Sequence, residues 1–579
     1  MTDDTDTTER NRRIALAVNL MTGMSDDADF VAHFTDDAVW HLNRRSIHGH
    51  EGLAQLSQRA RESFPQGMER EIRSVVAEGN RVVIQHTNRA LTKDGVDYLN
   101  EYVKVFEFAR DGLIQAVWEY LDSRYAVEVL TSHTAPVPPE WRQAFEWVER
   151  TIGGRVVRWE IQPRWRPACF IDVEVDGTIV ALYWRGARGA LDHGISDLHY
   201  EYNVLQVLEA HGIPVPHIYG FCDEPEGLLL ARLPGRTEMV DAADDDERIA
   251  LLDQYVEIMA RMHAIPIADF EARGLRRPTT SDELGLADFD AWERVYRAKK
   301  RGPAPMEEFG IRWIRRNMPP ERSKVCFVTA DCGQFLFEHG RITAVLDFEF
   351  SYLGDPAADL AGLRCRDAAH SLGDMRRAFA KYAELTGDHI DPRVIDYHTV
   401  RFGWVNPLSL GWMCVDPPKE INYVQYKAWY VLCSKWSLDV LATLTDALID
   451  PPEIPDSAPS PRGPAYQLMV AALDPENAVD AARAYEVGSL HRIAQYLEQS
   501  DIFGPAFEHD NMTDVAEILG YRPANWQQAE ADLERFVLAA SPEHDAALVR
   551  LFHRRLTREE ALLQPALGYL TGSRIASID

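Results

Sequence analysis

Two aspartates stand at the ends of short apolar strands near the middle of this 579-residue chain. The run Val325–Val328 leads into Asp331, and the run Ile342–Leu346 ends directly on Asp347. Carboxylates at the ends of adjacent strands can face one cleft. Phosphoryl transfer needs such a pair, because one carboxylate orients and deprotonates the attacking hydroxyl while another holds the magnesium that bridges the phosphates. Asp331 and Asp347 are therefore candidates for such a pair.

The elements that must position these aspartates belong to a long mixed region, residues 140–450. Its first third is rich in strands, and the remainder is mostly helical apart from one strand–turn–strand unit at residues 324–347. Proline-rich stretches at residues 134–139 and 451–464 are typical of linkers. Residues 465–579 show helical patterns alone, and we expect a separate helical domain there.

The N-terminal part of the chain follows a different pattern. Residues 1–11 are polar and acidic, and we expect them to be disordered. Two helical patterns, at residues 12–22 and 53–64, precede three runs in which apolar and polar residues alternate: 81–91, 99–108 and 113–120. Helices followed by an antiparallel meander predict an α+β unit over residues 12–132. The whole chain is therefore expected to be a multidomain α+β protein.

The chain is strongly acidic, with a formal net charge of −30 and a pI near 5.1. Such a surface disfavours nucleic acid and anionic lipid as partners, because it offers no excess of basic residues to replace phosphate counterions. A locally basic site for an anionic cofactor is still compatible with this charge. No apolar run reaches the ~20 residues that span a bilayer, and nothing resembles a signal peptide. We expect a cytoplasmic protein without membrane or nucleic-acid partners.

The stretch around the second aspartate resembles a known family. Five motifs carry the resemblance: Val345–Glu349 (VLDFE), Gly354–Pro356 (GDP), Asp359–Ala361 (DLA), Glu201–Leu205 (EYNVL) and Gly212–Pro216 (GIPVP). In order and spacing they are similar to motifs of the aminoglycoside phosphotransferase and choline kinase-like (APH) family, over roughly residues 140–450. The resemblance implies a bilobal protein-kinase-like fold. It also implies that ATP (or GTP) and Mg2+ are used to phosphorylate a hydroxyl of a small molecule.

The same resemblance implies that Asp331 is the catalytic residue and Asp347 a metal ligand, and it assigns roles to three further residues. Gln334 stands at the second metal-binding position, where the family has asparagine, and is expected to offer an amide oxygen to magnesium. Arg185 falls at the position of the family's phosphate-gripping cation, and an arginine can fill that role. Glu201 falls at the position of the helix glutamate that pairs with this cation. Both are therefore expected to contribute to nucleotide binding.

Departures from the family pattern leave two interpretations open. The family sequence His-Gly-Asp reads Thr329-Ala330-Asp331 here, and a shorter loop leads to Gln334. Where relatives have a glycine-rich phosphate loop, residues 162–167 read QPRWRP, although close backbone approach to phosphates favours residues without a Cβ. The chain is either an active phosphotransferase or a pseudokinase that binds a ligand without transferring phosphate.

The N-terminal unit resembles the SnoaL-like branch of the nuclear transport factor 2 (NTF2) superfamily. The landmarks are FTDDAVW at residues 34–40, HGHEGL at 48–53 and VWEYLD at 117–122. The resemblance implies an NTF2-like α+β cone with an apolar pocket, which commonly dimerises through its sheet. The expected order along the chain is therefore this cone, the kinase-like fold and an all-α C-terminal segment.

Polar residues of the cone predict a secondary pocket. Strand alternation places Tyr120 and Asp122 on one face of a strand and Glu119 on the opposite face. His86 lies on another strand, and with Tyr102 the set His86, Tyr102, Tyr120 and Asp122 is predicted to supply acid and base groups inside the pocket. The alternative is that these side chains are structural or lie at a dimer surface.

Several functions are compatible with these two modules. One is a small-molecule phosphotransferase whose appended cone binds or further processes the substrate. Another is a pseudokinase scaffold with lyase, isomerase or dehydratase chemistry in the cone. The modules could also act together as an ATP-dependent dehydratase, since phosphorylation turns a hydroxyl into a good leaving group. The last is an interaction protein without catalysis. In each case we expect a homo-oligomer, most simply a dimer.

Overall fold

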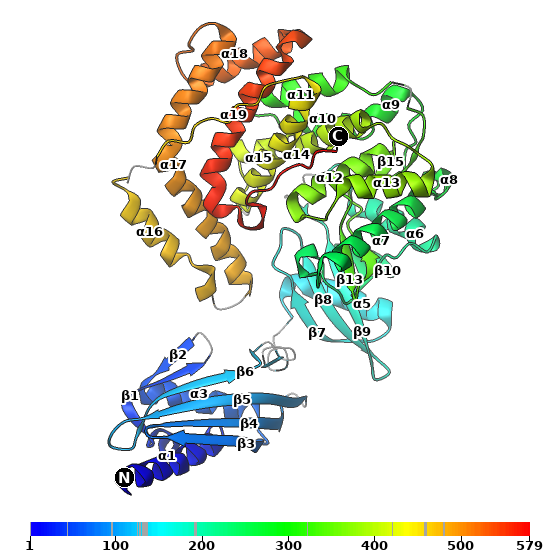
Figure 1. The fold of residues 1–579 in the computed structure, drawn as a ribbon. Helices are drawn as coiled ribbons and strands as arrows, with labels where there is room; N and C mark the ends of the chain where they lie inside the picture. Colours follow the sequence, from blue (N-terminus) through cyan, green and yellow to red (C-terminus); the bar gives the residue numbers. More distant parts are fainter. Residues whose placement is uncertain are drawn as a thin grey trace. The chain divides into compact units, whose positions relative to one another are not determined.

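The computed structural model describes residues 2–42, 45–93, 96–123, 125–126, 129, 137–189, 194–320, 322–419, 421–456, 460–478 and 481–578. The chain divides into two compact units, shown in Figure 1. The first consists of residues 1–142 with 157–160, and the second of residues 143–156 with 161–579. The predicted linker at residues 134–139 lies largely outside the described residues, as does the predicted boundary at residue 132.

The described residues of the first unit form a six-stranded sheet with three α-helices (Figure 1). The strand order is β2-β1-β6-β5-β4-β3; strands β3 to β6 form an antiparallel meander, and β1 pairs with β6 in parallel. The elements are α1 (Thr2–Met21), α2 (Asp27–Val31), β1 (Phe34–Leu42), β2 (Arg45–His48), α3 (Gly49–Ser63), β3 (Met68–Glu78), β4 (Arg81–Leu91), β5 (Asp97–Phe108) and β6 (Ile114–Leu121). The predicted α+β fold is confirmed.

Residues 2–11, which were expected to be disordered, form the first half of helix α1. The helix already begins at Thr2 and continues without a break to Met21. Ala15 is fully buried in the apolar core of the unit, and Asn11 Nδ2 donates to the carbonyl of Gly79 at 3.1 Å. A polar N-terminus becomes helical here because the turns that follow it pack against the sheet, and local composition does not reveal that packing.

The second unit begins with a five-stranded sheet in the order β10-β11-β9-β8-β7. Helix α6 contacts β10 and β11, and the Asp197 side chain caps its first turn by accepting from Tyr200 N at 2.8 Å. The elements are α5 (Arg142–Ile152), β7 (Arg155–Ile161), β8 (Ala168–Val175), β9 (Thr178–Gly186), α6 (Leu198–Ala210), β10 (Ile218–Asp223) and β11 (Glu226–Ala231). This half brings Arg185 of β9 and Glu201 of α6 close together.

The second half of this unit is mainly helical, as predicted. Two short antiparallel pairs, β13 with β14 and β12 with β15, interrupt the helices. The elements are α7 (Asp245–His263), α8 (Ile267–Glu271), α9 (Ser281–Leu286), α10 (Phe289–Lys299), α11 (Pro305–Arg316), β12 (Cys326–Val328), β13 (Phe335–Glu338), β14 (Arg341–Val345), β15 (Tyr352–Gly354), α12 (Ala357–His370), α13 (Met375–Thr386), α14 (Pro392–Val415) and α15 (Tyr423–Leu444).

The C-terminal helices confirm the predicted all-α C-terminal segment, and they belong to the same compact unit as the residues before them. These helices are α16 (Gly463–Ala472), α17 (Ala481–Leu519), α18 (Trp526–Ala539) and α19 (Asp545–Leu563). Phe552 of α19 packs against Phe309 of α11 with ring centroids 5.7 Å apart, and Lys427 Nζ of α15 lies 2.8 Å from Glu559 Oε1. The helical pattern was visible in the sequence, but the surface against which these helices pack was not.

The second predicted linker, residues 451–464, leads into helix α16. Residues 451–456 and 460–462 form no helix or strand, and α16 begins at Gly463. Across the part of the chain that the structure describes, no helix is both long enough and apolar enough to cross a membrane.

Candidate functional site

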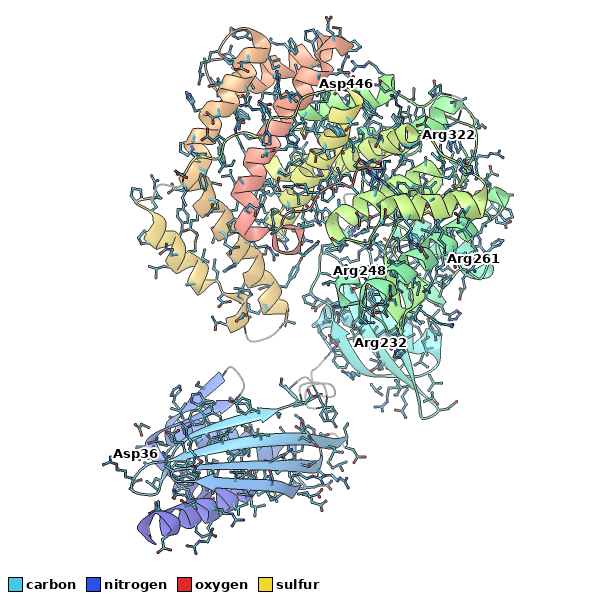
Figure 2. The ribbon with its side chains drawn as sticks, viewed as in Figure 1. Asp36, Arg232, Arg248, Arg261, Arg322 and Asp446 are labelled. Carbon is cyan, nitrogen blue, oxygen red and sulfur yellow. The ribbon has the colours of Figure 1, made fainter. Side chains whose placement is uncertain are left out.

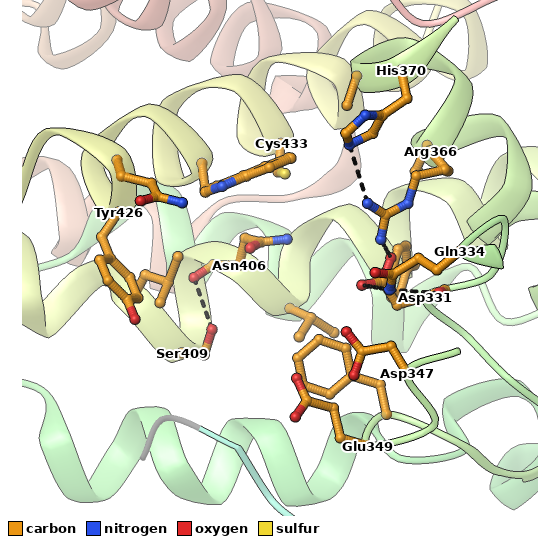
Figure 3. A pocket seen from close by; sticks show the side chains of 18 of the residues that line it. Asp331, Gln334, Asp347, Glu349, Arg366, His370, Asn406, Ser409, Tyr426 and Cys433 are labelled. Carbon is orange, nitrogen blue, oxygen red and sulfur yellow. Dashed lines mark hydrogen bonds and ion pairs between the residues drawn. The ribbon is translucent and has the colours of Figure 1, made fainter. Parts of the chain in front are cut away.

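Two turns after short strands place the predicted carboxylates at one cavity. After β12 the chain passes through Ala330, whose φ is +63°, to Asp331, and after β14 it reaches Asp347, whose φ is +65°. Residues other than glycine rarely adopt this left-handed backbone, so the surrounding structure must hold both turns in place. Both side chains line the same cavity, where Figure 3 shows them near each other.

Asp359 in the first turn of α12 holds the first of these turns. Its fully buried carboxylate accepts hydrogen bonds from Thr329 N at 3.2 Å and from Ala330 N at 2.8 Å. Gly362 allows α12 to approach closely, since a Cβ there would lie 1.9 Å from the Ala330 carbonyl oxygen. The loop that presents the first carboxylate is therefore positioned by α12.

Asp355, which precedes α12, is a structural carboxylate. It accepts from Arg322 Nε and Nη2, each at 2.7 Å, and from Ala357 N at 3.0 Å. Although burial opposes ionisation, the Arg322 guanidinium holds the pKa of Asp355 well below its usual range. Arg322 is labelled in Figure 2. This ion pair fixes the start of the helix that supports the site.

The cavity has a volume of about 310 Å³, and its two ends differ in chemistry (Figure 3). The charged lining residues gather around the two aspartates: Arg188, Asp331, Asp347, Glu349, Arg366 and His370. Neutral side chains form the rest, and among them are Val405, Asn406, Ser409, Leu410, Tyr426, Trp429 and Trp436. Tyr569, close to the C-terminus, also lines the cavity and stacks on His370 at 5.4 Å. No sequence pattern indicated that the C-terminal segment contributes to this site.

Asp331 is held from two sides. Arg366 forms an ion pair with its Oδ1, and Gln334 Nε2 donates to its Oδ2 at 3.0 Å. Burial raises the pKa of Asp331, Arg366 opposes that rise, and the charge of Asp347 adds to it. A raised pKa brings a carboxyl group closer to the range in which it can exchange protons at neutral pH. The structure thus brings Asp331, Gln334 and Asp347 together, as the sequence predicted.

Arg185 joins three carboxylates. Its Nε donates to Glu201 Oε2 at 2.8 Å, and its Nη2 lies 2.6 Å from Asp347 Oδ1 and 3.2 Å from Glu349 Oε2. The predicted pair of Arg185 and Glu201 is therefore present. Burial opposes ionisation of Asp347, but Arg185 and two further arginines lower its pKa to about 2. Asp347 is ionised at neutral pH, as a metal-binding carboxylate must be.

Two arginines that the sequence analysis did not single out complete this network. Arg166, in the loop between β7 and β8, reaches Glu349 Oε2 with Nη2 at 2.5 Å, and Arg188 pairs with Glu349 Oε1. The sequence could have pointed to both residues. Two arginines stand in the loop where glycines were expected, and Arg188 closely follows Arg185. What the sequence could not show is that all these side chains point to the same carboxylates.

In the first unit, the structure corrects part of the predicted secondary pocket. His86 is fully buried and stacks on Tyr102, with ring centroids 5.1 Å apart. Tyr120 is 54% exposed, however, and Asp122 is exposed and accepts from the Tyr125 backbone N–H at 3.0 Å. Tyr120 and Asp122 therefore do not join His86. Alternation showed correctly which residues share a face of the strand, but it did not determine which face is inside.

The interior face of β6 instead carries Glu119, which is 8% exposed. Its Oε2 accepts from Trp40 Nε1 at 2.9 Å, and its Oε1 lies 3.3 Å from Lys104 Nζ. Lys104 is directly opposite Glu119 in the pairing of β5 with β6. The buried ionic pair of this unit was therefore missed, although the inward alternation of β5 would have pointed to Lys104.

Comparisons with known proteins agree with this division of the chain. Residues 188–398 match the model of the phosphotransferase enzyme family (APH), and residues 20–117 match that of the SnoaL-like domain. Acyl-CoA dehydrogenase family member 11 of Rattus norvegicus is 27% identical over 175 residues, which cover 28% of this chain and 22% of that protein. Acyl-CoA dehydrogenase family member 10 of Mus musculus is 25% identical over 173 residues, 28% of this chain and 16% of that protein. The matched segment thus spans less than a quarter of either relative.

Two solved structures are similar to separate parts of the chain. The apoenzyme of the macrolide 2'-phosphotransferase MphH from Brachybacterium faecium is 19% identical, covering 50% of this chain and 97% of that one, with a TM-score of 0.36. An NTF2-like protein from Burkholderia xenovorans LB400 is 21% identical, covering 21% of this chain and 97% of that one, with a TM-score of 0.19. The family matches and the observed elements together identify a SnoaL-like, NTF2-like domain in the first unit and a domain of the phosphotransferase enzyme family, with its kinase-like fold, in the second.

Proposed function

We propose that this chain is a phosphotransferase that transfers the terminal phosphate of ATP (or GTP) to a hydroxyl group of a small molecule. The observation that supports this proposal most is that Asp331 and Asp347 line one end of one cavity and that the Arg185–Glu201 pair contacts Asp347. A base for the hydroxyl, an ionised carboxylate for a metal and a cation for the phosphates are the parts that phosphoryl transfer needs.

Asp331 is the proposed base. Its Oδ2 accepts from Gln334 and its Oδ1 pairs with Arg366, so the carboxylate is held in one orientation before any acceptor binds. It would take the proton of the acceptor hydroxyl as that oxygen attacks phosphorus. Arg366 is a positioning residue in this scheme, because it acts through Asp331.

Asp347 and Gln334 are the proposed magnesium ligands. Among the described residues, no three His, Cys, Asp or Glu side chains are grouped to hold a metal ion. Magnesium does not require such a group, since it binds through one or two protein oxygens and completes its shell with phosphates and water. Gln334 donates its amide N–H to Asp331, which leaves the amide oxygen for a cation. Bound magnesium would supply electrostatic stabilisation of the transferring phosphate.

The neutral end of the cavity indicates the class of acceptor. Asn406 and Ser409 lie there among aromatic and aliphatic side chains, and the acidic lining residues are all at the other end. A polycationic acceptor would need carboxylates along its length, whereas a neutral body with one reactive hydroxyl would bury apolar surface and use the amide and hydroxyl groups for orientation. We therefore propose a neutral, largely apolar alcohol as the acceptor.

Nucleotide binding and turnover test the proposal. We expect magnesium–ATP or magnesium–GTP to raise the thermal midpoint of the purified chain. Slow nucleotide hydrolysis should also appear, and Asp331→Ala should abolish it. The control is Asp374→Asn, a change at an exposed helix N-cap that does not line the cavity, and it should leave hydrolysis unchanged. The proposal fails if neither nucleotide binds. Binding with no turnover on any neutral alcohol would favour the pseudokinase interpretation, which the Thr329, Gln334 and loop departures motivate.

A second candidate function is acid–base chemistry in the first unit, and one specific observation favours it. His86 is fully buried, and its Nε2 has no hydrogen-bond partner among the described residues. Burial, together with the charges of Lys104 and Arg70, lowers the pKa of His86 to about 3, so the ring is neutral at pH 7. A neutral imidazole with an unpartnered nitrogen can hydrogen-bond a ligand, and a ligand that carries negative charge would raise the pKa of the ring toward the range in which it can accept a proton.

The two candidates predict opposite effects of matched substitutions. If the first unit carries the chemistry alone, His86→Ala removes product formation and Asp331→Ala leaves it intact. The reverse pattern supports the phosphotransferase alone. If His86→Ala instead makes a phosphorylated compound accumulate, the two units act in sequence, as an ATP-dependent dehydratase would.

A further inference from the structure

The loop that stands in the place of a glycine-rich phosphate loop presents a buried arginine. Residues 162–167 connect β7 to β8. The backbone N–H of Gly186 in β9 donates to the Pro167 carbonyl at 2.7 Å and so holds the end of this loop in place. Arg166 extends from this loop to Glu349, and its side chain is only 4% exposed. The loop therefore offers a fixed guanidinium, rather than backbone amides, to the carboxylate end of the site.

Arg188 reaches the same carboxylate from the end of β9. It pairs with Glu349 Oε1, and its side chain is 7% exposed. Arg188 and Glu349 line both the 310 Å³ cavity and a second cavity of about 230 Å³, which Arg166 also lines. The two guanidiniums thus lie where the two cavities share residues, beside the proposed position of the transferring phosphate.

The positive and negative charges of this network balance one another. Three arginines face three carboxylates: Arg166, Arg185 and Arg188, and Glu201, Asp347 and Glu349. A divalent cation on Asp347 would leave the buried network with two uncompensated positive charges, and such an excess is costly away from water. The compensating group must be a multivalent anion. Guanidinium groups match phosphate oxygens in geometry and in charge.

We infer that Arg166 and Arg188 bind the phosphates of the nucleotide, in place of the missing glycine-rich loop. This inference rests on the proposed phosphotransferase function and assigns the residues that grip its cosubstrate. Without nucleotide the two guanidiniums neutralise Glu349, and with nucleotide they exchange that carboxylate for phosphate oxygens. Arg166 Nε, buried without a hydrogen-bond partner among the described residues, is a further donor for the same ligand.

Calorimetric titration of the full chain with ATP, ADP and adenosine, each with excess magnesium, tests the inference. We expect Arg166→Gln and Arg188→Gln each to weaken ATP and ADP binding by about tenfold or more, because each removes charge-assisted hydrogen bonds to phosphate. Adenosine lacks phosphates, so its Kd should stay within about twofold of the wild-type value. The matched control is Arg164→Gln in the same loop, whose guanidinium is exposed and donates to the Tyr183 hydroxyl at 3.1 Å. It should change none of the three affinities.

A double variant separates phosphate binding from simple neutralisation of Glu349. Arg166→Gln with Glu349→Gln removes one charge of each sign, so we expect the thermal midpoint to return to the wild-type value while ATP affinity stays low. The inference is overturned if the double variant recovers ATP affinity, or if both single variants bind ATP as tightly as the wild type. If the wild type binds neither ATP nor adenosine, the proposed function itself fails and the inference falls with it.

Discussion

The carboxylate of Asp359 allows a direct test of how the loop that carries Asp331 is held in place. It is fully buried and accepts from Thr329 N, Ala330 N and His263 Nε2, the last at 2.9 Å. Asp359→Asn preserves the size of the side chain but turns one acceptor oxygen into an NH2 group. That group must face either a backbone N–H or the histidine, so at least one donor loses its partner.

The magnitude follows from the number of hydrogen bonds affected. A hydrogen bond to a charged acceptor contributes about 1.5–3 kcal/mol, and a buried donor left unsatisfied costs a comparable amount. We therefore expect Asp359→Asn to lower the free energy of unfolding of the second unit by about 2–4 kcal/mol. The loop that carries Asp331 should loosen at the same time, so nucleotide turnover should fall more than nucleotide affinity.

The assay combines urea unfolding with hydrogen exchange of the peptide that spans residues 326–332. Asp374→Asn is a matched control, since Asp374 also accepts from two backbone N–H groups, of Arg376 and Arg377, but at an exposed helix N-cap. Asparagine caps helices as well as aspartate does, so this control should change stability by less than about 0.5 kcal/mol. Equal losses in the two variants, or unchanged exchange of the loop amides in Asp359→Asn, would refute the reasoning.

Two further predictions concern helix α11. Burial raises the pKa of Glu307 to about 7, so the folded state binds the extra proton between the ordinary carboxyl pKa and pH 7. The free energy of unfolding should therefore fall by up to about 3 kcal/mol as pH rises through that window. Urea unfolding at pH 5 and pH 8 measures this dependence, and Glu307→Gln should remove it. A variant with the same pH dependence as the wild type would contradict the prediction. Gly310→Ala would place a Cβ 1.8 Å from the fully buried Trp404 ring and should destabilise by about 1–3 kcal/mol. Gly488→Ala, at a position in helix α17 where a Cβ would lie no closer than 3.7 Å to Pro475, should instead stabilise by up to about 1 kcal/mol, and thermal unfolding of both variants would expose any reversal.

The features that the sequence predicted well are those encoded in short stretches. Asp331 and Asp347 follow their strands directly, and a few residues of loop fix their place at the strand ends. Strand β4 likewise begins and ends where alternation alone put it, at Arg81 and Leu91. In these cases the signal and the structure span the same few residues, so no knowledge of distant packing was needed.

The features that were missed depend on contacts between distant parts of the chain. Period-two alternation could not show that Glu119 faces Lys104 in the interior while Tyr120 faces outward, because a strand has the same period whichever side is covered. The loop at 162–167 was interpreted only from its lack of glycine. The contact of Arg166 with Glu349 was not foreseen, because it joins residues that are far apart in the sequence. Long-range ion pairs of this kind become visible only once the fold is known.

The overall charge of the chain makes the arginine network more informative. With a net charge of −30, a polyphosphate approaching this protein is repelled by the surface as a whole, so attraction must come from cations close to the site. Arg166, Arg185 and Arg188 lie there, and each is paired with a carboxylate. An anion arriving alone would have to displace these carboxylates, whereas an anion arriving with a divalent cation gives them a new partner. If the proposed function holds, the chain should therefore bind a metal–nucleotide complex in preference to free nucleotide, which is the form of phosphate donor that a phosphotransferase needs.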